Sequence, residues 1–567
     1  MSDDATQHDG EPDFSVAQPE AAPEWPLRPW LLAGLLGLAG LLIHLVTGGN
    51  DDVPWQMATA AFLFFGAIAA AFTLEHGRWK EPALFALAAG LVMAGLAWRA
   101  VQYGEYLPDE EYGFMAGVVA TALALPLFQA GFHRRRFATP YAEIYGHVWT
   151  DAISAAAALA FTGLSWIVLV LMSELFHLLR IDLLRDLMDD GWFGWTFSGL
   201  AAGAALGTVR NQLKVLATMQ TVVLLVASLL AVPLALGLVV FLLATVVSGP
   251  QVLWDATRSA TPLLLACAAG AFVLANAIAR HGDEAMTGSR AMRIAGWVLA
   301  AVILPLALFA AVSMGLRIGQ YGLAPERLWG LVAIVVACVC GVAYWAALIR
   351  GRNAGWAGHL RKATFHLGLV VCGLAILLAL PILDFGAISA RNQVSRLENG
   401  RVTPEQFDFT ALRWDFGSSG RKALERLSRS GNAKVAELAQ AALTQSERVY
   451  ATFDETNKTR ADFKLRVQPD DGEVRERVLD YLVVNPYLCS ERCVALDLGE
   501  ARDGGQRIAI VQGGSYQVIV ARPGMTPVQE PVAGGFKPLR ADSVVEVSEA
   551  RVIRIDGDVI GSPIPDD

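Results

Sequence analysis

The sequence predicts an α-helical polytopic membrane protein with about eleven transmembrane helices and a small C-terminal extracytoplasmic α+β domain. Three observations support this fold class. Hydrophobic residues make up 54% of the 567 residues and charged residues only 17%, which is unusual for a soluble globular chain. Long apolar stretches fill the first two thirds of the chain, and a membrane-spanning helix takes about 20 such residues. Lys and Arg concentrate in every second gap between those stretches.

Residues 1–28 are predicted to form a disordered acidic tail on the cytoplasmic side. Seven carboxylates accompany a single cation, Arg28, and aliphatic residues are almost absent. The tail lacks the basic start and the early apolar core of a cleaved signal peptide. We therefore expect the first apolar stretch to stay as a membrane anchor.

The transmembrane bundle is expected within residues 29–387. Its predicted helices are 29–47, 55–74, 82–98, 113–131, 150–178, 193–208, 216–248, 261–280, 292–316, 327–349 and 366–385. The stretch around Pro233 is about thirty residues long. It is therefore either one long kinked helix or two short ones.

The charges in the connecting loops predict the orientation of the bundle, because short cytoplasmic loops carry an excess of Lys and Arg. With a single crossing at Pro233, one side holds more than twice as many cations as the other. The cation-poor side also carries the acidic loops 105–111 and 186–190. We therefore predict a cytoplasmic N-terminus and an odd number of crossings, which places the C-terminal domain in the periplasm.

The extracytoplasmic part is expected to begin with a helical segment, residues 388–467. Thr403-Pro404-Glu405 resembles a helix start, with Pro in the first turn. Apolar residues then recur at helical spacing from Ala423 to Leu443, which predicts a small helical hairpin.

A β-rich domain is expected over residues 468–567. Strands are predicted at 507–511, 516–521 and 544–555. The turn Asp556-Gly557 followed by Val559-Ile560 predicts a closing hairpin.

Two cysteines fall in this extracytoplasmic part, Cys489 and Cys493, within the sequence CSERC. In an oxidising compartment such a close pair is a disulfide candidate, and two separate thiols are the alternative. A closed zinc site takes four Cys or His ligands, whereas all nine histidines precede residue 390. We therefore expect no metal and no cofactor, and no histidine-based catalysis in this domain.

Three stretches of sequence resemble the bacterial multi-pass inner-membrane family catalogued as domain of unknown function 4153. They are LRIGQYGLAPERLWGL (316–331), ISARNQVSRLENGRVTPEQFDFTALRWDFGSSGRKALERL (388–427) and SELFHLLRIDLLRDLMDDGWFGW (173–195). The resemblance covers most of residues 30–430. It implies a bacterial inner-membrane protein and no established activity.

Glu174 and His177 form the candidate intramembrane polar pair. They are three residues apart and so share one helix face, and ionisable groups within a membrane are costly enough to suggest a function. A proton relay or a metal pair is one interpretation. We favour the other, a buried polar contact between helices, because a catalytic metal usually takes three protein ligands.

A second candidate site follows the ninth predicted helix. Arg317, Gln320, Tyr321 and Arg327 could contact a lipid headgroup or another anion, since Arg forms bidentate contacts with such groups. Interfacial anchoring is the alternative.

The densest polar cluster on the predicted inner side begins with Arg134, Arg135 and Arg136. A basic run beside a membrane helix is typical of orientation signals and of contact with anionic lipid. Asp151, a little further on, is expected to start a helix.

The motifs of common enzyme classes are missing from the sequence: it has no Walker loop, GxSxG, HExxH or CxxC. The leading hypothesis is a non-enzymatic envelope protein whose external domain binds or senses a partner. A transporter or lipid-handling protein that uses the helix bundle is one alternative, and an outward-facing membrane transferase is another. The expected partners are the lipid bilayer and an envelope protein, with no nucleic acid.

Overall fold

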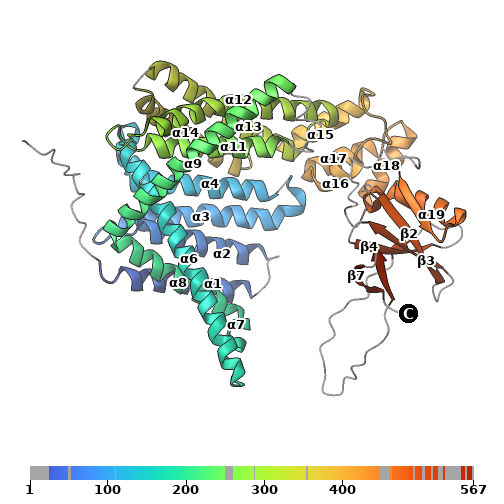
Figure 1. Ribbon diagram of the computed structural model, residues 1–567, viewed down its shortest axis with the longest axis horizontal. Coiled ribbons are helices and arrows are strands. Elements are labelled where there is room, and N and C mark those ends of the chain that lie inside the picture. The colour runs from blue at the N-terminus through green and yellow to red at the C-terminus, as the bar shows by residue number, and fades with distance from the viewer. Residues whose placement is uncertain are drawn as a thin grey trace, which may run out of the picture. The chain divides into compact units, whose positions relative to one another are not determined.

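The computed structural model describes the chain in segments. The chain divides into two compact units, Met1–Ser446 and Glu447–Asp567. The described segments are 25–48, 53–108, 110–249, 260–286, 288–352, 355–445, 448, 460, 463–489, 492–500, 505–512, 515–521, 528–529, 551–555 and 558–564. The first unit is helical, and the second is built around a β-sheet (Figure 1).

Long helices dominate the described part of the first unit. They are α1 (Arg28–Thr47), α2 (Pro54–Thr73), α3 (Lys80–Tyr103), α4 (Glu110–Gln129), α6 (Tyr141–Leu178), α8 (Gly191–Asn211), α9 (Leu213–Ser248), α11 (Ala260–Ala279), α12 (Arg290–Tyr321), α13 (Pro325–Gly351) and α14 (Trp356–Ala379). Ten of these described helices are long and apolar enough to cross a membrane. The prediction of a polytopic helical membrane protein is therefore confirmed, with one candidate crossing fewer than the eleven expected.

The helix left out of those ten is α8, which was expected as a crossing at 193–208. Its many Gly, Trp, Ser and Thr residues lower its hydropathy. Even so, α8 lies antiparallel to α1 along the whole of that helix, with Gly191 next to His44 and Gly207 next to Pro29. Small residues allow two helix backbones to approach this closely. Helix α8 thus resembles a membrane-spanning helix in how closely it packs on α1, although its hydropathy is lower.

Two other expectations about helix limits are decided by the structure. The stretch around Pro233 forms one continuous helix, α9. The expectation that Asp151 starts a helix is wrong, because α6 already begins at Tyr141, directly after Pro140. Asp151 lies inside α6, where it is buried and ion-paired with Arg210 of α8. A carboxylate within a helix is stable there because a cation from a neighbouring helix compensates its charge.

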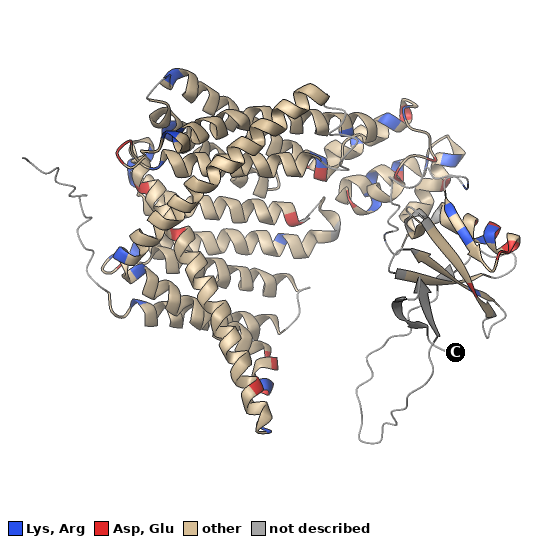
Figure 2. Cartoon of the chain, viewed as in Figure 1, with Lys and Arg blue, Asp and Glu red and all other residues tan. Residues whose placement is uncertain are grey.

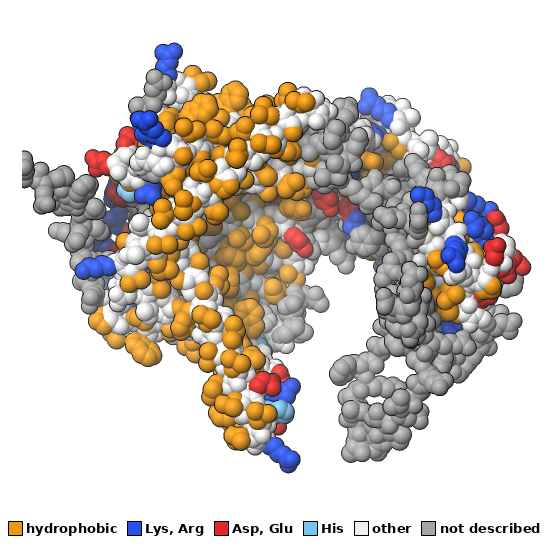
Figure 3. All heavy atoms as spheres, in the orientation of Figure 1, with side chains coloured by type: hydrophobic (Ala, Val, Ile, Leu, Met, Phe, Trp, Pro, Cys, Tyr) orange, Lys and Arg blue, Asp and Glu red, His pale blue; other side chains and the backbone are white. Residues whose placement is uncertain are grey.

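Charged side chains lie mainly at the ends of the long helices, and the middles are almost free of them (Figure 2). Hydrophobic side chains cover the bundle face seen in Figure 3, including the exposed flank of α6. One end of the bundle contains the start of α1 and the end of α8, where Arg28 contacts the Arg210 carbonyl. We call this the cation-rich end. The α12–α13 turn lies at the opposite end.

The buried core of the bundle is largest between α9 and the four helices from α11 to α14. Leu299, Leu306 and Ala271 there are fully buried. Alanines between the larger side chains let α11 and α12 pack closely. This half of the bundle supports the turn between α12 and α13.

Four short helices follow the bundle within the same unit: α15 (Phe385–Glu398), α16 (Phe409–Trp414), α17 (Gly417–Leu427) and α18 (Ala433–Leu443). The helical hairpin expected between Ala423 and Leu443 is present as α17 and α18. The helix start expected at Thr403–Glu405 is wrong, since those residues form a turn. The next helix begins only after Asp408, whose carboxylate accepts the Ala411 N–H at 2.8 Å.

The second unit contains a five-stranded sheet in the order β1-β2-β3-β4-β5. Its strands are β1 (Lys464–Gln468), β2 (Arg492–Glu500), β3 (Gln506–Gln512), β4 (Ser515–Ala521) and β5 (Val528–Gln529). The β1–β2 pair is parallel and the later pairs are antiparallel. Helix α19 (Gly472–Val484) connects β1 to β2, and its Val478 and Leu482 are fully buried in the core of this unit.

The strands predicted at 507–511 and 516–521 are confirmed as β3 and β4. The predicted closing hairpin is present as β6 (Arg551–Ile555) and β7 (Asp558–Ile564), with Ile553 opposite Ile560. Residues 544–550 and the turn Asp556-Gly557 lie outside the described residues. The sequence analysis missed β1, α19 and β2.

The α1–α8 contact predicts that Gly203→Ala destabilises the bundle. A Cβ atom at Gly203 would lie 2.2 Å from the Leu32 carbonyl oxygen, so the two backbones must separate. Overpacking of this kind costs about 1–3 kcal/mol. Thermal unfolding of the detergent-solubilised protein should therefore show a lower midpoint.

The matched control is Gly237→Ala in α9, because a Cβ atom there meets nothing within 4 Å. This variant should melt at or slightly above the temperature of the unaltered protein. Equal midpoints for the two variants would show that close packing of α8 on α1 does not stabilise the bundle.

Candidate functional site

The turn between α12 and α13 forms many hydrogen bonds with side chains that are distant from it in the described sequence. Helix α12 ends at Tyr321, and Gly322 follows with φ of +76°, a conformation that favours glycine. The amide of Gly322 closes the helix by donating to the Ile318 carbonyl at 2.9 Å. Pro325 then begins α13. The last carbonyls of α12 are left without helical partners.

Side chains of α15 supply those missing partners. The guanidinium of Arg396 donates to the Gly319 carbonyl at 3.0 Å and to the Gln320 carbonyl at 2.5 Å. The amide of Gln393 donates to the Tyr321 carbonyl at 2.8 Å and to the Leu323 carbonyl at 2.9 Å. Asn392, in turn, accepts the Leu323 N–H at 2.9 Å. Helix α15 is thus bound to the backbone of the α12–α13 turn.

Arg327, in the first turn of α13, completes the set. Its guanidinium donates to the Gly322 carbonyl at 2.7 Å and lies over the Tyr321 ring. Five consecutive carbonyls, from Gly319 to Leu323, therefore accept hydrogen bonds from side chains. We call this arrangement the carbonyl clamp.

Gly322 is needed in the clamp for space as well as for its backbone angle. A Cβ atom on it would lie 2.7 Å from Nε2 of Gln393 and 2.9 Å from Cδ of Arg396. Either contact would displace a donor of the clamp. The sequence GQYG at the end of α12 is thus matched to the sequence NQVSR of α15.

A polar cavity of about 180 Å³ lies near the start of α15. Its lining includes Arg99, Tyr106, Trp329, Asp384 and Ser418, which come from α3, the 3₁₀ turn η1 (Gly104–Tyr106), α13 and the segments around α15 and α17. The cavity therefore lies where the bundle meets the short helices of the same unit.

Aromatic rings hold the walls of this cavity together. Trp329 stacks on Tyr112 with ring centroids 5.5 Å apart and meets Phe385 edge-on at 5.1 Å. The guanidinium of Arg421 lies 4.7 Å from the centre of the Tyr106 ring. Gly417, with φ of +58°, packs against the Tyr106 carbonyl. The short helices are thereby attached to the bundle at a second point besides the clamp.

The ionisable groups that line the cavity differ in the hydrogen bonds and ion pairs that they make. Asp384 caps α15 by accepting the Ala387 N–H at 2.8 Å, and its other oxygen accepts the Ser419 hydroxyl at 2.9 Å. Arg99 is half-buried and makes no ion pair with any described residue. Among the described residues, Arg99 is thus a cation without an ion-pair partner and Asp384 a carboxylate bonded on both oxygens, an arrangement that suits binding of an anionic or carbonyl group better than acid–base chemistry.

The predicted pair Glu174 and His177 lies near the C-terminal end of α6, and both side chains are exposed. The structure brings His177 to Asp182 instead, with Nδ1 and Oδ1 2.5 Å apart. Asp182 precedes α7 (Leu183–Asp189). The buried polar contact between helices that the sequence favours for this pair, and the proton relay or metal pair that it leaves open, both stay predictions.

Three of the four residues predicted to contact a headgroup, Gln320, Tyr321 and Arg327, belong to the clamp. Arg327 donates to the clamp carbonyls, and Gln320 and Tyr321 contribute their carbonyl groups to it. A contact between these residues or Arg317 and a lipid headgroup stays a prediction. Within the described residues, His, Cys, Asp and Glu side chains form no group of three or more that could hold a metal.

Cys489 and Cys493 are joined by a disulfide bond in the second unit, and both are buried. Cys489 ends the 3₁₀ turn η4 (Pro486–Cys489), and Cys493 lies in β2. The bond therefore connects this turn to β2 within the buried core that the sheet forms with α19.

The sequence analysis missed a buried polar network at the cation-rich end. Asn276 of α11 donates to the Tyr344 hydroxyl at 2.6 Å and accepts from the Thr364 hydroxyl at 3.0 Å. Three helices are thereby joined within an apolar core. An Asn inside the predicted span 261–280 was the available signal, since such residues often bond across membrane helices.

A second network missed by the sequence analysis surrounds Asp151. Its carboxylate accepts from Arg210 at 2.8 Å and from Gln129 at 3.3 Å, and Gln129 also donates to the Phe72 carbonyl. The ends of α2, α4 and α8 are thus joined to α6. Because both networks connect helices near one end of the bundle, they stabilise the scaffold from which the clamp projects at the other end.

The fold and these junctions define a class, a polytopic α-helical membrane protein with a C-terminal mixed sheet. Residues 57–427 match the family model described as "Domain of unknown function (DUF4153)". The match covers more than half of the chain, so the chain belongs to this family, as the sequence analysis expected. The matched range includes both stretches of sequence that form the clamp. No curated protein and no solved structure matches the chain.

The clamp predicts that Arg396→Ala loosens the α12–α13 turn. Two charge-assisted hydrogen bonds are lost, and such bonds contribute about 1.5–3 kcal/mol each. Hydrogen–deuterium exchange of the peptide 316–331 should become at least about tenfold faster. Arg396→Lys should have an intermediate effect, since one ammonium replaces a two-pronged guanidinium.

Arg391→Ala provides the matched control on the same helix. Arg391 is exposed, and among the described residues its Nε donates within α15, to the Ala387 carbonyl. Exchange of 316–331 should be unchanged in this variant. Equal acceleration in Arg391→Ala and Arg396→Ala would contradict a specific role of the clamp.

Proposed function

We propose that this protein is a non-enzymatic envelope protein of the bacterial inner membrane whose C-terminal domain binds or senses an envelope partner. The carbonyl clamp is the observation that carries this proposal. It binds α15 directly to the α12–α13 turn through four backbone carbonyls, and Arg327 of α13 binds the fifth. A displacement of α15 is therefore transmitted to the ends of two membrane helices.

The form of the clamp supports transmission better than catalysis. Its donors are side chains and its acceptors are backbone carbonyls, so no group in it is free to attack or protonate a substrate. A second attachment, at Gly417 and Tyr106, joins the short helices to the α3–α4 turn. Movement of the short helices thus acts on two separate turns of the bundle.

The proposal includes the predicted topology, with the N-terminus in the cytoplasm and the C-terminal domain in the periplasm. The asymmetry of Lys and Arg supports it. So does the antiparallel packing of α8 along all of α1, because a helix that follows a crossing helix from end to end crosses as well. The number of crossings is then eleven. The disulfide between Cys489 and Cys493 suits an oxidising compartment.

We expect a topology reporter fused after Gln445 to give alkaline phosphatase activity and no green fluorescence. The fusion point follows α18, the last helix of the first unit. A fusion after Arg352, between α13 and α14, serves as the control and should give the opposite pattern. Fluorescence after Gln445 would mean that the crossings are even in number and that the proposed compartment is wrong.

Complementation of a deletion strain tests the function itself. The strain is first screened under envelope stress for a growth defect that the full-length protein corrects. Two variants are then compared at equal abundance: residues 1–446 alone, and the full chain with Gln393→Ala and Arg396→Ala. We expect neither to restore growth, because one lacks the partner-binding unit and the other lacks the clamp.

The two variants separate the two parts of the proposal. Full growth with residues 1–446 would overturn a role of the C-terminal unit. Full growth with the double variant would overturn transmission through the clamp while leaving partner binding intact. Arg391→Ala, expected to behave as the full-length protein, controls for changes to α15 in general.

A further inference from the structure

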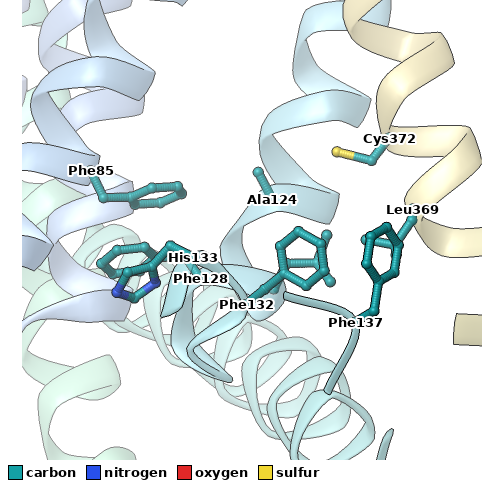
Figure 4. A pocket seen from close by; sticks show the side chains of 9 residues that line it. Phe85, Ala124, Phe128, Phe132, His133, Phe137, Leu369 and Cys372 are labelled. Atoms are coloured by element: carbon teal, nitrogen blue, oxygen red, sulfur yellow. The ribbon is translucent and has the colours of Figure 1, made fainter. Parts of the chain in front are cut away.

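A wide apolar groove lies on the surface of the bundle, near its cation-rich end. Its volume is about 440 Å³. The lining side chains include Phe85, Phe128, Phe132, Phe137, Leu369 and Cys372, from α3, α4, α5 (Phe132–Arg135), the turn η2 (Arg136–Ala138) and α14 (Figure 4). Among the lining residues, the polar ring of His133 is the exception.

Aromatic contacts brace the groove open. Phe85 stacks on Phe128 with centroids 4.4 Å apart, and His133 stacks on the same Phe128 at 4.9 Å. Phe132 meets Phe137 edge-on at 6.2 Å on the other side. Figure 4 shows the two groups of rings facing each other across Ala124. A small side chain at the floor between two braced walls leaves room for an elongated apolar molecule.

The depth and the position of the groove suit a lipid acyl chain. The α5 turn at the mouth contacts α14 at Phe365, and the groove reaches Cys372 further along that helix. At 1.5 Å per helical residue, this distance along the helix is about 10 Å. Phe137 at the mouth is 73% exposed. The groove therefore runs from the end of the bundle into its apolar zone.

The mouth of the groove is cationic. Arg134 pairs with Glu81, and Arg135 pairs with Glu143 at 2.6 Å. Lys80, at the start of α3, and Arg136, adjacent to Phe137, are exposed and make no ion pair with the described residues. Among the described residues these two positive charges have no ion-pair partner, and they lie near in sequence to the groove-lining Phe85 and Phe137.

We propose that this groove binds one anionic phospholipid, with an acyl chain against the phenylalanines and the phosphate at Arg136 and Lys80. The two free cations select against a zwitterionic headgroup, whose own positive charge they repel. Within the bilayer the acyl chain exchanges contacts with other lipid chains for contacts with the phenylalanines, so the groove supplies shape and van der Waals contact, and the headgroup contacts supply selectivity. The site does not depend on the function proposed for the C-terminal domain.

Photolabelling of the full-length protein in vesicles tests the proposal. The vesicles are phosphatidylcholine with a small, equal fraction of either phosphatidylglycerol or phosphatidylcholine carrying a diazirine on one acyl chain. Mass spectrometry then locates the label. We expect phosphatidylglycerol to label the peptides around 124–137 and 365–372 several-fold more than phosphatidylcholine does.

Two variants separate headgroup selection from chain binding. The double variant Lys80→Gln, Arg136→Gln should abolish the difference between the two lipids. Ala124→Trp should fill the groove and lower labelling by both. Ala160→Trp, at an exposed position of α6, is the control and should leave labelling unchanged, because α6 contributes no residue to the lining of the groove.

Equal labelling by the two lipids in the unaltered protein would overturn the proposal, since it means an ordinary lipid-facing surface. So would labelling that survives both the charge substitutions and Ala124→Trp. The surface charge variant keeps the test decisive if Ala124→Trp fails to fold, because Lys80 and Arg136 are exposed and their replacement leaves the core intact.

Discussion

The backbone carbonyls at the end of α12 are the constraint on which the junction between the bundle and the short helices depends. A helix end leaves carbonyls without partners, and near a membrane water satisfies them poorly. Here Arg396, Gln393 and Arg327 satisfy five in succession. Because Arg396 and Gln393 come from α15, the helix end is stable only when α15 is docked. A local requirement for hydrogen bonds thereby becomes a connection between the bundle and the segment after it.

The same requirement explains how the rest of the bundle holds together. Apolar side chains gain little from helix association within lipid, so close backbone packing and buried polar contacts must supply specificity. The glycine face of α8 on α1 supplies the first. The networks around Asn276 and Asp151 supply the second. Both polar networks lie near the cation-rich end, whereas the clamp and the polar cavity lie near the other.

The two ends of the bundle are therefore chemically different. At one end, the exposed cations Lys80 and Arg136 lie near in sequence to Phe85 and Phe137 of an apolar groove. At the other, guanidinium and amide groups are occupied by backbone carbonyls and hold the short helices in place. The proposed lipid site and the attachment of α15 are thus separated by the length of the helices between them.

By itself, the sequence determined the class of protein, nearly all of the long helices, and the strands β3 and β4, because apolar periodicity and loop charge are local properties. It also marked 316–331 and 388–427 as distinctive. Only the tertiary structure decided that these two stretches meet, since hydrogen bonds such as that from Gln393 to Tyr321 join residues 72 positions apart.

Asp151 shows the same division between local pattern and fold. Its sequence context suggested a helix start, and its place inside α6 depends on Arg210 from another helix. The local sequence pattern shows where a polar residue occurs, but the packing of the helices decides which residue becomes its partner.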